Sequence, residues 1–210
     1  MENVNTLSNF IWIFCDIEQT FPINNSNLQK NIFDAINNLR ILDNSIKVIF
    51  SFISSQKIEF VNEIYEEYIG NKYNFIVKGP QIGDSNFIYN NEIFGFGKKT
   101  FLPKSTQIMY MINKYKNLQN LKQIYYIDDL PFCMPIVINL NENFINKLEK
   151  NNIGFNIIAP VGKTIYDDIN PIIKIYEQDT NNFFIEGLYK IIDEKQNKKQ
   201  LKKIIKRGNE

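Results

Sequence analysis

The chain of 210 residues contains no histidine, only two cysteines and almost no net charge, because 24 basic residues stand against 23 acidic ones. The missing histidine excludes Ser-His-Asp and Cys-His catalysis, histidine-ligated zinc and imidazole pH switches. Cys15 and Cys133 are too few for a disulfide framework or a four-thiolate zinc site, and both lie among apolar residues. Acid, base and metal-ligand chemistry therefore falls to carboxylates, lysine, tyrosine or cysteine.

The N-terminal segment lacks the features of a targeting or membrane sequence. Residues 1–5 carry no positive charge cluster, and the longest early apolar run, residues 10–15, is far shorter than a membrane span. We therefore expect no membrane partner, and a location in the cytoplasm of a bacterium or of an infected host cell, or in a virion. Isoleucine, asparagine and lysine are abundant while alanine and arginine are scarce, which indicates an AT-rich genome such as that of a bacterium or phage.

Apolar runs alternate with helical patterns along the chain, which predicts one α/β domain of Rossmann-like, three-layer architecture with a central, mostly parallel sheet. Strands are expected at residues 10–15, 47–53, 74–77, 123–127, 135–140 and 155–159. The remainder beyond residue 159 is expected to be helical. We predict a domain over residues 1–180 with a small hairpin insertion at about 82–101, followed by a helical basic tail over 181–210.

Polar and acidic residues follow three of the expected strands. Residues 16–20 (Asp-Ile-Glu-Gln-Thr) follow the first, Ser54 follows the second, and Asp128 and Asp129 follow the strand at 123–127. Because the carboxyl ends of parallel strands meet at one edge of a sheet, these side chains are expected to converge there. Carboxylates so gathered repel one another unless a cation such as Mg²⁺ neutralises them, and that cation would attract a phosphate.

The ordered set of these motifs resembles the haloacid dehalogenase-like (HAD) superfamily of phosphohydrolases over about residues 10–160. The first motif of that family, an apolar strand followed by Asp-x-Asp-x-Thr or Val, matches residues 14–20 except that Glu18 replaces the second Asp. The second, an apolar strand ending in Ser or Thr, is similar to residues 48–54. The third, a lysine, is best matched by Lys104, and the fourth, an acidic pair after a strand, by residues 128–129.

The resemblance implies a Mg²⁺-dependent phosphatase in which Asp16 attacks phosphorus and forms a transient aspartyl phosphate that water hydrolyses. Glu18 would be the proton donor and acceptor. The implied Mg²⁺ ligands are the Asp16 carboxylate, the backbone carbonyl of Glu18 and the carboxylate of Asp128 or Asp129.

The family pattern also implies that the Ser54 hydroxyl, the Lys104 ammonium and Thr20 bind phosphoryl oxygens. The spacing between motifs leaves room for a minimal cap only, at most the small insertion. An open site of this kind favours a nucleotide, a nucleic-acid end or another large phosphorylated substrate.

Glu18 also supports a second interpretation. Its extra methylene displaces the carboxyl group, and a misplacement of about 1 Å can cost on the order of 100-fold in rate. The alternative is a catalytically silent HAD-like module with a binding or structural role, for example in a phage or viral assembly. In a plainer interpretation the acids are solvated helix caps, Ser54 caps the next helix, and Lys104 is one of several surface lysines.

The C-terminal segment is strongly basic although the whole chain is nearly neutral. Its cations are Lys195, Lys198, Lys199, Lys202, Lys203, Lys206 and Arg207. The segment is either a solvated terminal helix or a local surface for nucleic acid or a protein partner.

Overall fold

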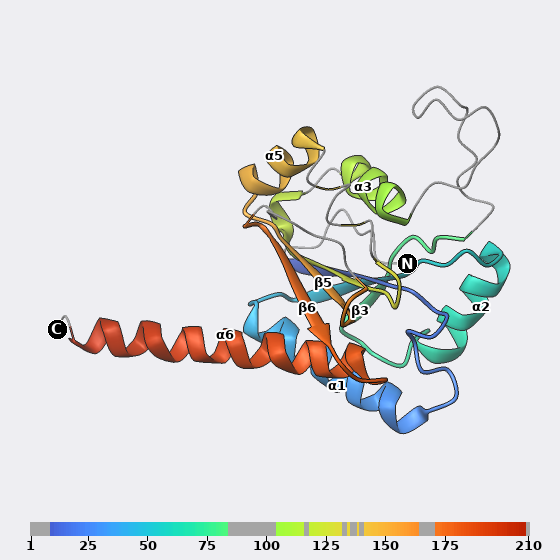
Figure 1. Cartoon of the computed structure of the whole chain (residues 1–210), viewed down its shortest axis with the longest axis horizontal. Coiled ribbons are helices and arrows are strands. Elements are labelled where there is room, and N and C mark those ends of the chain that lie inside the picture. The colour runs from blue at the N-terminus through green and yellow to red at the C-terminus, as the bar shows by residue number, and fades with distance from the viewer. Residues whose placement is uncertain are drawn as a thin grey trace.

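The computed structural model describes residues 9–83, 104–115, 118–131, 134, 138, 141–163 and 171–208. Within these residues six strands form one sheet in the order β3-β2-β1-β4-β5-β6, and every neighbouring pair is parallel (Figure 1). The strands are β1 (Phe10–Cys15), β2 (Lys47–Phe52), β3 (Ile76–Lys78), β4 (Leu121–Ile127), β5 (Gly154–Pro160) and β6 (Ile173–Gln178). The predicted α/β class with a Rossmann-like sheet is therefore confirmed.

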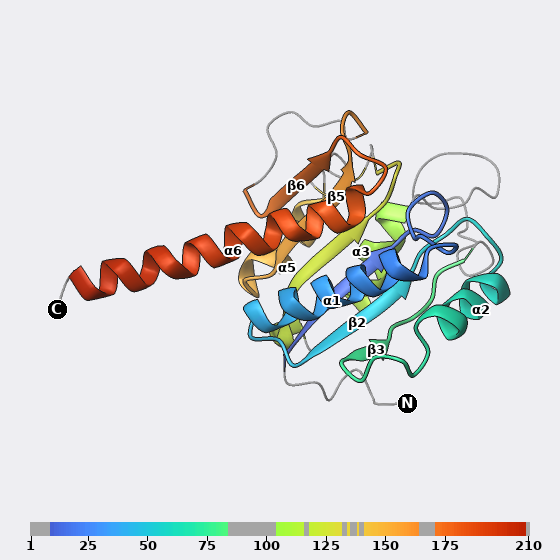
Figure 2. The same cartoon turned by 90° about the horizontal axis from the view of Figure 1, so that it is seen from below.

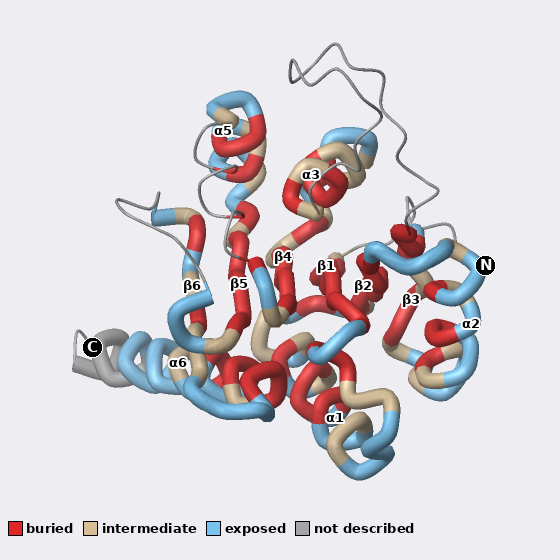
Figure 3. Tube along the Cα trace, turned by 45° about the vertical axis from the view of Figure 1, so that its right-hand side comes forward, coloured by how far each residue is buried: buried red, intermediate tan, exposed pale blue. Residues whose placement is uncertain are grey.

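Helices cover both faces of this sheet. One face carries α1 (Ser26–Leu42), α2 (Ile58–Tyr68) and the first half of α6 (Phe183–Gly208), and the other carries α3 (Lys104–Lys114) and α5 (Glu142–Lys150). A short 3-10 turn, Leu118–Asn120, leads into β4. Figure 3 shows the buried strands between these two helical layers, which is the three-layer arrangement expected from the sequence.

Burial on both faces explains the uniformly apolar first strand. Every residue of β1 is buried, with Ile11, Ile13 and Cys15 facing the core under α1 and Trp12 facing the core under α3. Such continuous apolar runs are typical of parallel strands between two helical layers. The Trp12 indole donates a hydrogen bond of 3.0 Å to the buried Ser51 hydroxyl of β2, which satisfies the polar atoms of both side chains.

Asparagine side chains cap the N-termini of two helices. The Asn25 carboxamide oxygen accepts a hydrogen bond of 3.0 Å from the Leu28 amide at the start of α1. Asn141 caps α5 in the same way through the Phe144 amide, at 2.9 Å. These caps set where the chain turns back over the sheet.

The structure corrects the expected elements after residue 130. The segment 135–140 was predicted as a strand, but its one described residue, Ile138, is helical and buried beneath the α3 layer. The helix expected beyond residue 159 is wrong over β6, an edge strand whose mixed Ile-Lys-Ile-Tyr-Glu-Gln sequence reflects its half-exposed position. Residues 84–103, which hold most of the expected hairpin insertion, and Cys133 lie outside the described residues.

Helix α6 joins the core to the basic C-terminal segment. Its first ten residues bury side chains against α1 and the sheet: Phe183, Phe184, Ile185, Leu188, Ile191 and Ile192. Beyond them the helix projects from the body of the molecule (Figure 2), and Leu201 is 58% exposed. Among the described residues, none of the helices is long and apolar enough to cross a membrane.

We expect Leu188→Ala to lower the free energy of unfolding by about 2–5 kcal/mol, because it removes a fully buried side chain and leaves a cavity. The matched control is Leu201→Ala on the exposed part of the same helix, which should change it by no more than about 0.5 kcal/mol. Urea unfolding of both variants measures the difference. A similar loss in the two would contradict the division of α6 into a core half and a projecting half.

Candidate active site

Three carboxylates meet at the carboxyl edge of the sheet. Asp16 follows β1, and Asp128 and Asp129 follow the neighbouring strand β4. The Asp16 amide donates to the Ile127 carbonyl at 2.9 Å, which holds the two strand ends together. One oxygen from each carboxylate lies within 4.8 Å of the others, and Asp16 and Asp128 are only 2% and 1% exposed. The convergence predicted from the strand ends is therefore present for these three residues.

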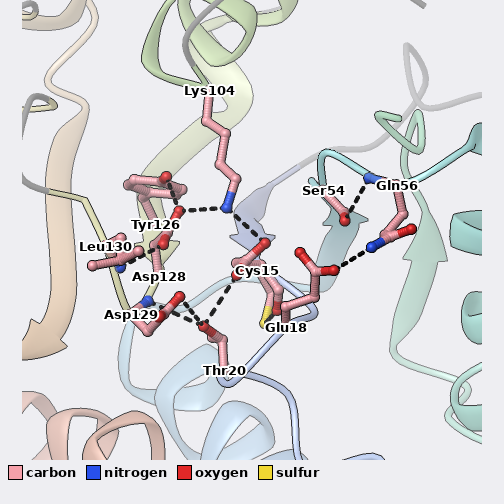
Figure 4. A network of polar contacts seen from close by, with 11 residues as sticks. Cys15, Glu18, Thr20, Ser54, Gln56, Lys104, Tyr126, Asp128, Asp129 and Leu130 are labelled. Atoms are coloured by element: carbon pink, nitrogen blue, oxygen red, sulfur yellow. Dashed lines mark hydrogen bonds and ion pairs between the residues drawn. The ribbon is translucent and has the colours of Figure 1, made fainter. Parts of the chain in front are cut away.

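Lys104, the first residue of α3, supplies the positive charge of the site. Its ammonium lies 2.7 Å from Asp16 Oδ1 and 3.0 Å from Asp128 Oδ2, so it bridges the two buried carboxylates (Figure 4). Lys104 belongs to the α3 layer, on the other face of the sheet from α1. In the sequence it precedes Asp128 by 24 residues. The structure thus brings together the lysine and the acids that the sequence proposed for one site.

Thr20 ties the loop after β1 to the acidic pair. Its hydroxyl lies 3.4 Å from an oxygen of Asp16 and 3.4 Å from an oxygen of Asp129, and it accepts a hydrogen bond of 3.1 Å from the Asp129 amide. Gln19 has a φ of 56°, in the left-handed region, which turns the loop so that Thr20 comes back towards β4. In this arrangement Thr20 contacts Asp16 and Asp129, and the phosphate contact expected for it stays a prediction.

Asp128 is held by two further hydrogen bonds. The Leu130 amide donates to Asp128 Oδ1 at 2.7 Å, and the Tyr126 hydroxyl donates to Asp128 Oδ2. Together with Lys104 these donors satisfy both oxygens of a fully buried carboxylate. Sequence reasoning missed Tyr126, although residues two apart in a strand point to the same face, and this spacing is the signal that could have identified it.

Ser54 and Glu18 lie beside the cluster and contact the same residue, Gln56. The Ser54 hydroxyl is buried and accepts a hydrogen bond of 3.0 Å from the Gln56 amide. The exposed Glu18 carboxylate accepts one from the Gln56 side-chain amide (Figure 4). Glu18 does not belong to the described carboxylate cluster. Gln56 was not predicted, and its place two residues after Ser54 is the only sequence signal for it.

The electrostatics of the cluster show an excess of negative charge. Burial, and after it the Asp128 carboxylate, raises the pKa of Asp16 to about 7 against the opposing effect of Lys104. Burial and Asp128 also raise the pKa of Asp129. Burial alone would lower the pKa of Lys104, but the carboxylates of Asp128 and Asp16 outweigh it and raise that pKa. Three carboxylates against one ammonium leave two formal negative charges, which a divalent cation would balance.

The donor set of the cluster fits Mg²⁺. That ion prefers oxygen ligands and is usually held by one or two carboxylates, and the three acids offer such oxygens close together. The described chain has no histidine or thiolate in the cluster that would favour zinc.

A cavity of about 560 Å³ adjoins the site on the α1 side of the sheet. It is lined by the loop from Ile17 to Asn25, by Gln56 and Phe60, and by the start of α6 at Phe184 and Ile185. Apolar side chains such as Ile17, Phe21 and Leu28 belong to its lining, and Glu18, Gln56 and several asparagines give it polar groups. A cavity of this size and mixed lining is typical of small-molecule sites.

Comparison with known proteins adds no family assignment. No family model matches the chain, and no curated protein matches its sequence. The chemistry of the site therefore has to be argued from its own geometry.

We expect Lys104→Met to lower the free energy of unfolding by about 1–3 kcal/mol, because Asp16 and Asp128 lose the cation between them. Adding Asp16→Asn to this variant should restore about half of the loss, since one of the two repelling charges is removed. Lys114→Met, on the exposed face of the same helix, is the control and should change stability by no more than about 0.5 kcal/mol. Denaturant unfolding measures all three. Equal losses in Lys104→Met and Lys114→Met would show that the bridging ammonium has no special electrostatic role.

Proposed function

We propose that this chain is a Mg²⁺-dependent phosphatase of the HAD-like type, acting on phosphomonoesters through an aspartyl phosphate. The observation that carries the proposal is the Lys104 ammonium held between Asp16 and Asp128, beside Asp129, at the carboxyl edge of a parallel sheet. This reaction requires a nucleophilic carboxylate, a cation that binds phosphate and carboxylates that hold a metal, and the cluster offers Asp16, Lys104 and the acidic residues as candidates for these roles.

In the proposed reaction an oxygen of Asp16 attacks phosphorus, the bond from phosphorus to the ester oxygen breaks, and the leaving alkoxide takes a proton. Water then loses a proton to the Glu18 carboxylate and attacks phosphorus of the aspartyl phosphate, the bond from phosphorus to the Asp16 oxygen breaks, and inorganic phosphate and the Asp16 carboxylate are released. Thr20 holds Asp16 in place from the loop side. The Lys104 ammonium binds phosphoryl oxygens and reduces the repulsion between an anionic nucleophile and an anionic substrate.

Glu18 is the proposed proton donor to the leaving group. Its side chain is exposed and held by Gln56, so it must leave this hydrogen bond to reach a substrate at Asp16. Ser54 is the proposed second phosphate contact, and its hydroxyl keeps its own proton for such a bond while it accepts from the Gln56 amide.

The carboxylates of Asp16, Asp128 and Asp129, with the backbone carbonyl of Glu18, are the proposed magnesium ligands. Bound Mg²⁺ supplies positive charge that offsets the phosphate and the crowded acids. Asp16 and Asp128 come to this role already fixed by hydrogen bonds, so little ordering is needed when a cation binds.

The cavity beside Glu18 is the proposed place for the leaving group of the substrate. Its volume of about 560 Å³ and its mixed polar and apolar lining suit a nucleotide, a nucleic-acid end or another sizeable phosphorylated molecule. We expect the protein to meet such substrates in the cytoplasm of a bacterium or of an infected host cell, or in a virion.

A second candidate function is a catalytically silent HAD-like module with a binding or structural role. The observation that favours it is the hydrogen bond from Gln56 to Glu18, which directs the proposed acid away from the carboxylate cluster. Such a module would bind Mg²⁺ and phosphate through the same residues without turnover.

We expect Mg²⁺ to stabilise the protein against heat, because it binds the folded cluster and not the unfolded chain. At about ten times its Kd the gain is about 1.4 kcal/mol, or about 3–6 °C in Tm for a chain of this size. Asp129→Asn should at least halve the shift, whereas Asp34→Asn, on the exposed face of α1, should leave it unchanged. A wild-type Tm that does not respond to millimolar Mg²⁺ would remove the metal from the proposal.

We expect the wild type to hydrolyse an aryl phosphate in the presence of Mg²⁺, and Asp16→Asn to abolish the reaction because the nucleophile is lost. Asp34→Asn is the charge-matched control and should retain wild-type turnover. Turnover by Asp16→Asn at the wild-type rate would mean that Asp16 is not the nucleophile.

The length of the side chain at position 18 provides a test that distinguishes the two candidate functions. Glu18→Asp shortens the side chain and breaks its hydrogen bond with Gln56. If the misplaced carboxyl group limits turnover, we expect this variant to raise kcat by up to about 100-fold. Gln56→Ala should raise kcat in the Glu18 protein but not in a Glu18→Gln background. The silent module predicts no turnover in any of these variants, together with an unchanged Mg²⁺ shift in Tm.

A further inference from the structure

A second cavity lies at the opposite end of the sheet from the acidic cluster. Its volume is about 650 Å³. The starts of β4, β5 and β6, the end of α5 and the middle of α6 line it, so it opens at the amino ends of the strands. Its lining includes three lysines, Lys174, Lys195 and Lys198, and two glutamates, Glu149 and Glu194.

Two of these lysines lie close to one another in the cavity lining. Lys174 comes from β6 and Lys198 from α6, and both side chains are exposed. Among the described residues no carboxylate forms an ion pair with either ammonium. Partial burial lowers the pKa of Lys174, and the charges of Lys198 and Lys195 lower it further against the opposing charge of Glu194. An anion bound between the two ammonium groups would therefore reduce the repulsion between them.

Partners within the protein already engage the other charges here. The Lys195 ammonium forms an ion pair with Asp43, whose second oxygen accepts a hydrogen bond of 3.0 Å from the Tyr125 hydroxyl. Glu194 accepts a hydrogen bond of 3.1 Å from the Tyr176 hydroxyl. Because Glu194 is fixed at Tyr176, it does not neutralise the pair of Lys174 and Lys198 by direct contact.

The positive charge continues along α6 beyond the cavity. Lys195, Lys198 and Lys202 are spaced three and four residues apart, so they share one face of the helix. The helix projects from the body in this region (Figure 2), and Lys198, Lys199 and Lys202 are exposed. We name the surface formed by Lys174, Lys195, Lys198 and Lys202 the basic strip.

We propose that the basic strip binds the phosphodiester backbone of single-stranded nucleic acid. A row of cations along a projecting helix matches a chain of phosphates better than it matches one isolated anion. The one aromatic residue in the cavity lining, Tyr176, is buried, so the strip offers no exposed platform for stacking bases. Binding is therefore electrostatic and independent of base sequence. The proposal does not rest on the phosphatase function, because the strip lies at the other end of the sheet from Asp16.

The test uses the full chain and a fluorescein-labelled oligothymidylate of about 20 nucleotides, with fluorescence anisotropy as the readout. Because Asp43 already engages Lys195, the phosphate contacts expected are those of Lys174, Lys198 and Lys202, which predict an affinity about 20-fold weaker at about 200 mM salt than at about 50 mM. Lys174→Gln/Lys198→Gln should weaken binding about fivefold to tenfold at the lower salt and reduce the dependence on salt to about one third. Asp16→Asn should bind like the wild type, which separates this proposal from the catalytic one.

The matched control is Lys30→Gln/Lys57→Gln, which removes the same charge from exposed positions outside the strip and should bind like the wild type. Lys198→Gln/Lys202→Gln repeats the test with changes confined to exposed side chains of α6. The proposal is overturned if the wild type does not bind the oligonucleotide, or if the strip and control variants lose equal affinity. Displacement by inorganic phosphate as effectively as by unlabelled oligonucleotide, at equal ionic strength, would also overturn it in favour of a single-phosphate site.

Discussion

The position of Lys104 between Asp16 and Asp128 is the interaction on which the candidate site depends. Two carboxylates with nearly complete burial cannot both be ionised in a folded protein without a cation close by. The ammonium lies within 3.0 Å of both, and the Lys104 side chain is 28% exposed, so the residue also contacts the solvent from which a phosphate would arrive. Its contacts fix the start of α3 over the ends of β1 and β4, and so link one helical layer to the functional edge of the sheet.

The sequence predicted the parts of this site that follow from strand ends and missed those that follow from side-chain direction. Asp16, Asp128 and Asp129 were predictable because uniformly apolar strands such as β1 end abruptly in acids. The direction of the Glu18 side chain was not predictable, because it depends on a hydrogen bond from Gln56, a residue with no chemical signature of its own. The sequence pattern was also less reliable for two other segments, since β6 mixes polar and apolar residues at an exposed edge, and Ile138, the one described residue of the apolar segment 135–140, is helical.

Helix α6 connects the two functional regions that we propose. Phe184 and Ile185 at its start line the cavity beside the acidic cluster, and Lys195 and Lys198 line the cavity at the other end of the sheet. The close packing of α6 on the sheet depends on Gly187, because a Cβ at this position would lie only 2.4 Å from the Ile158 side chain of β5. The glycine thus lets the first part of this helix of 26 residues pack closely against β5.

This geometry sets a length for any ligand that uses both regions. Fourteen residues of helix separate Phe184 from Lys198, and at 1.5 Å per residue they span about 21 Å. A nucleic acid held by the basic strip must therefore extend over several nucleotides before a terminal phosphate reaches Asp16. Substrates shorter than this span would engage the acidic cluster alone. Longer substrates would also bind the basic strip, and the affinity of the strip falls with salt while the reaction rate at the cluster does not. The net charge of the whole chain is almost zero, but its charges are separated in space. On these proposals the acidic edge requires a cation and the basic strip attracts an anion.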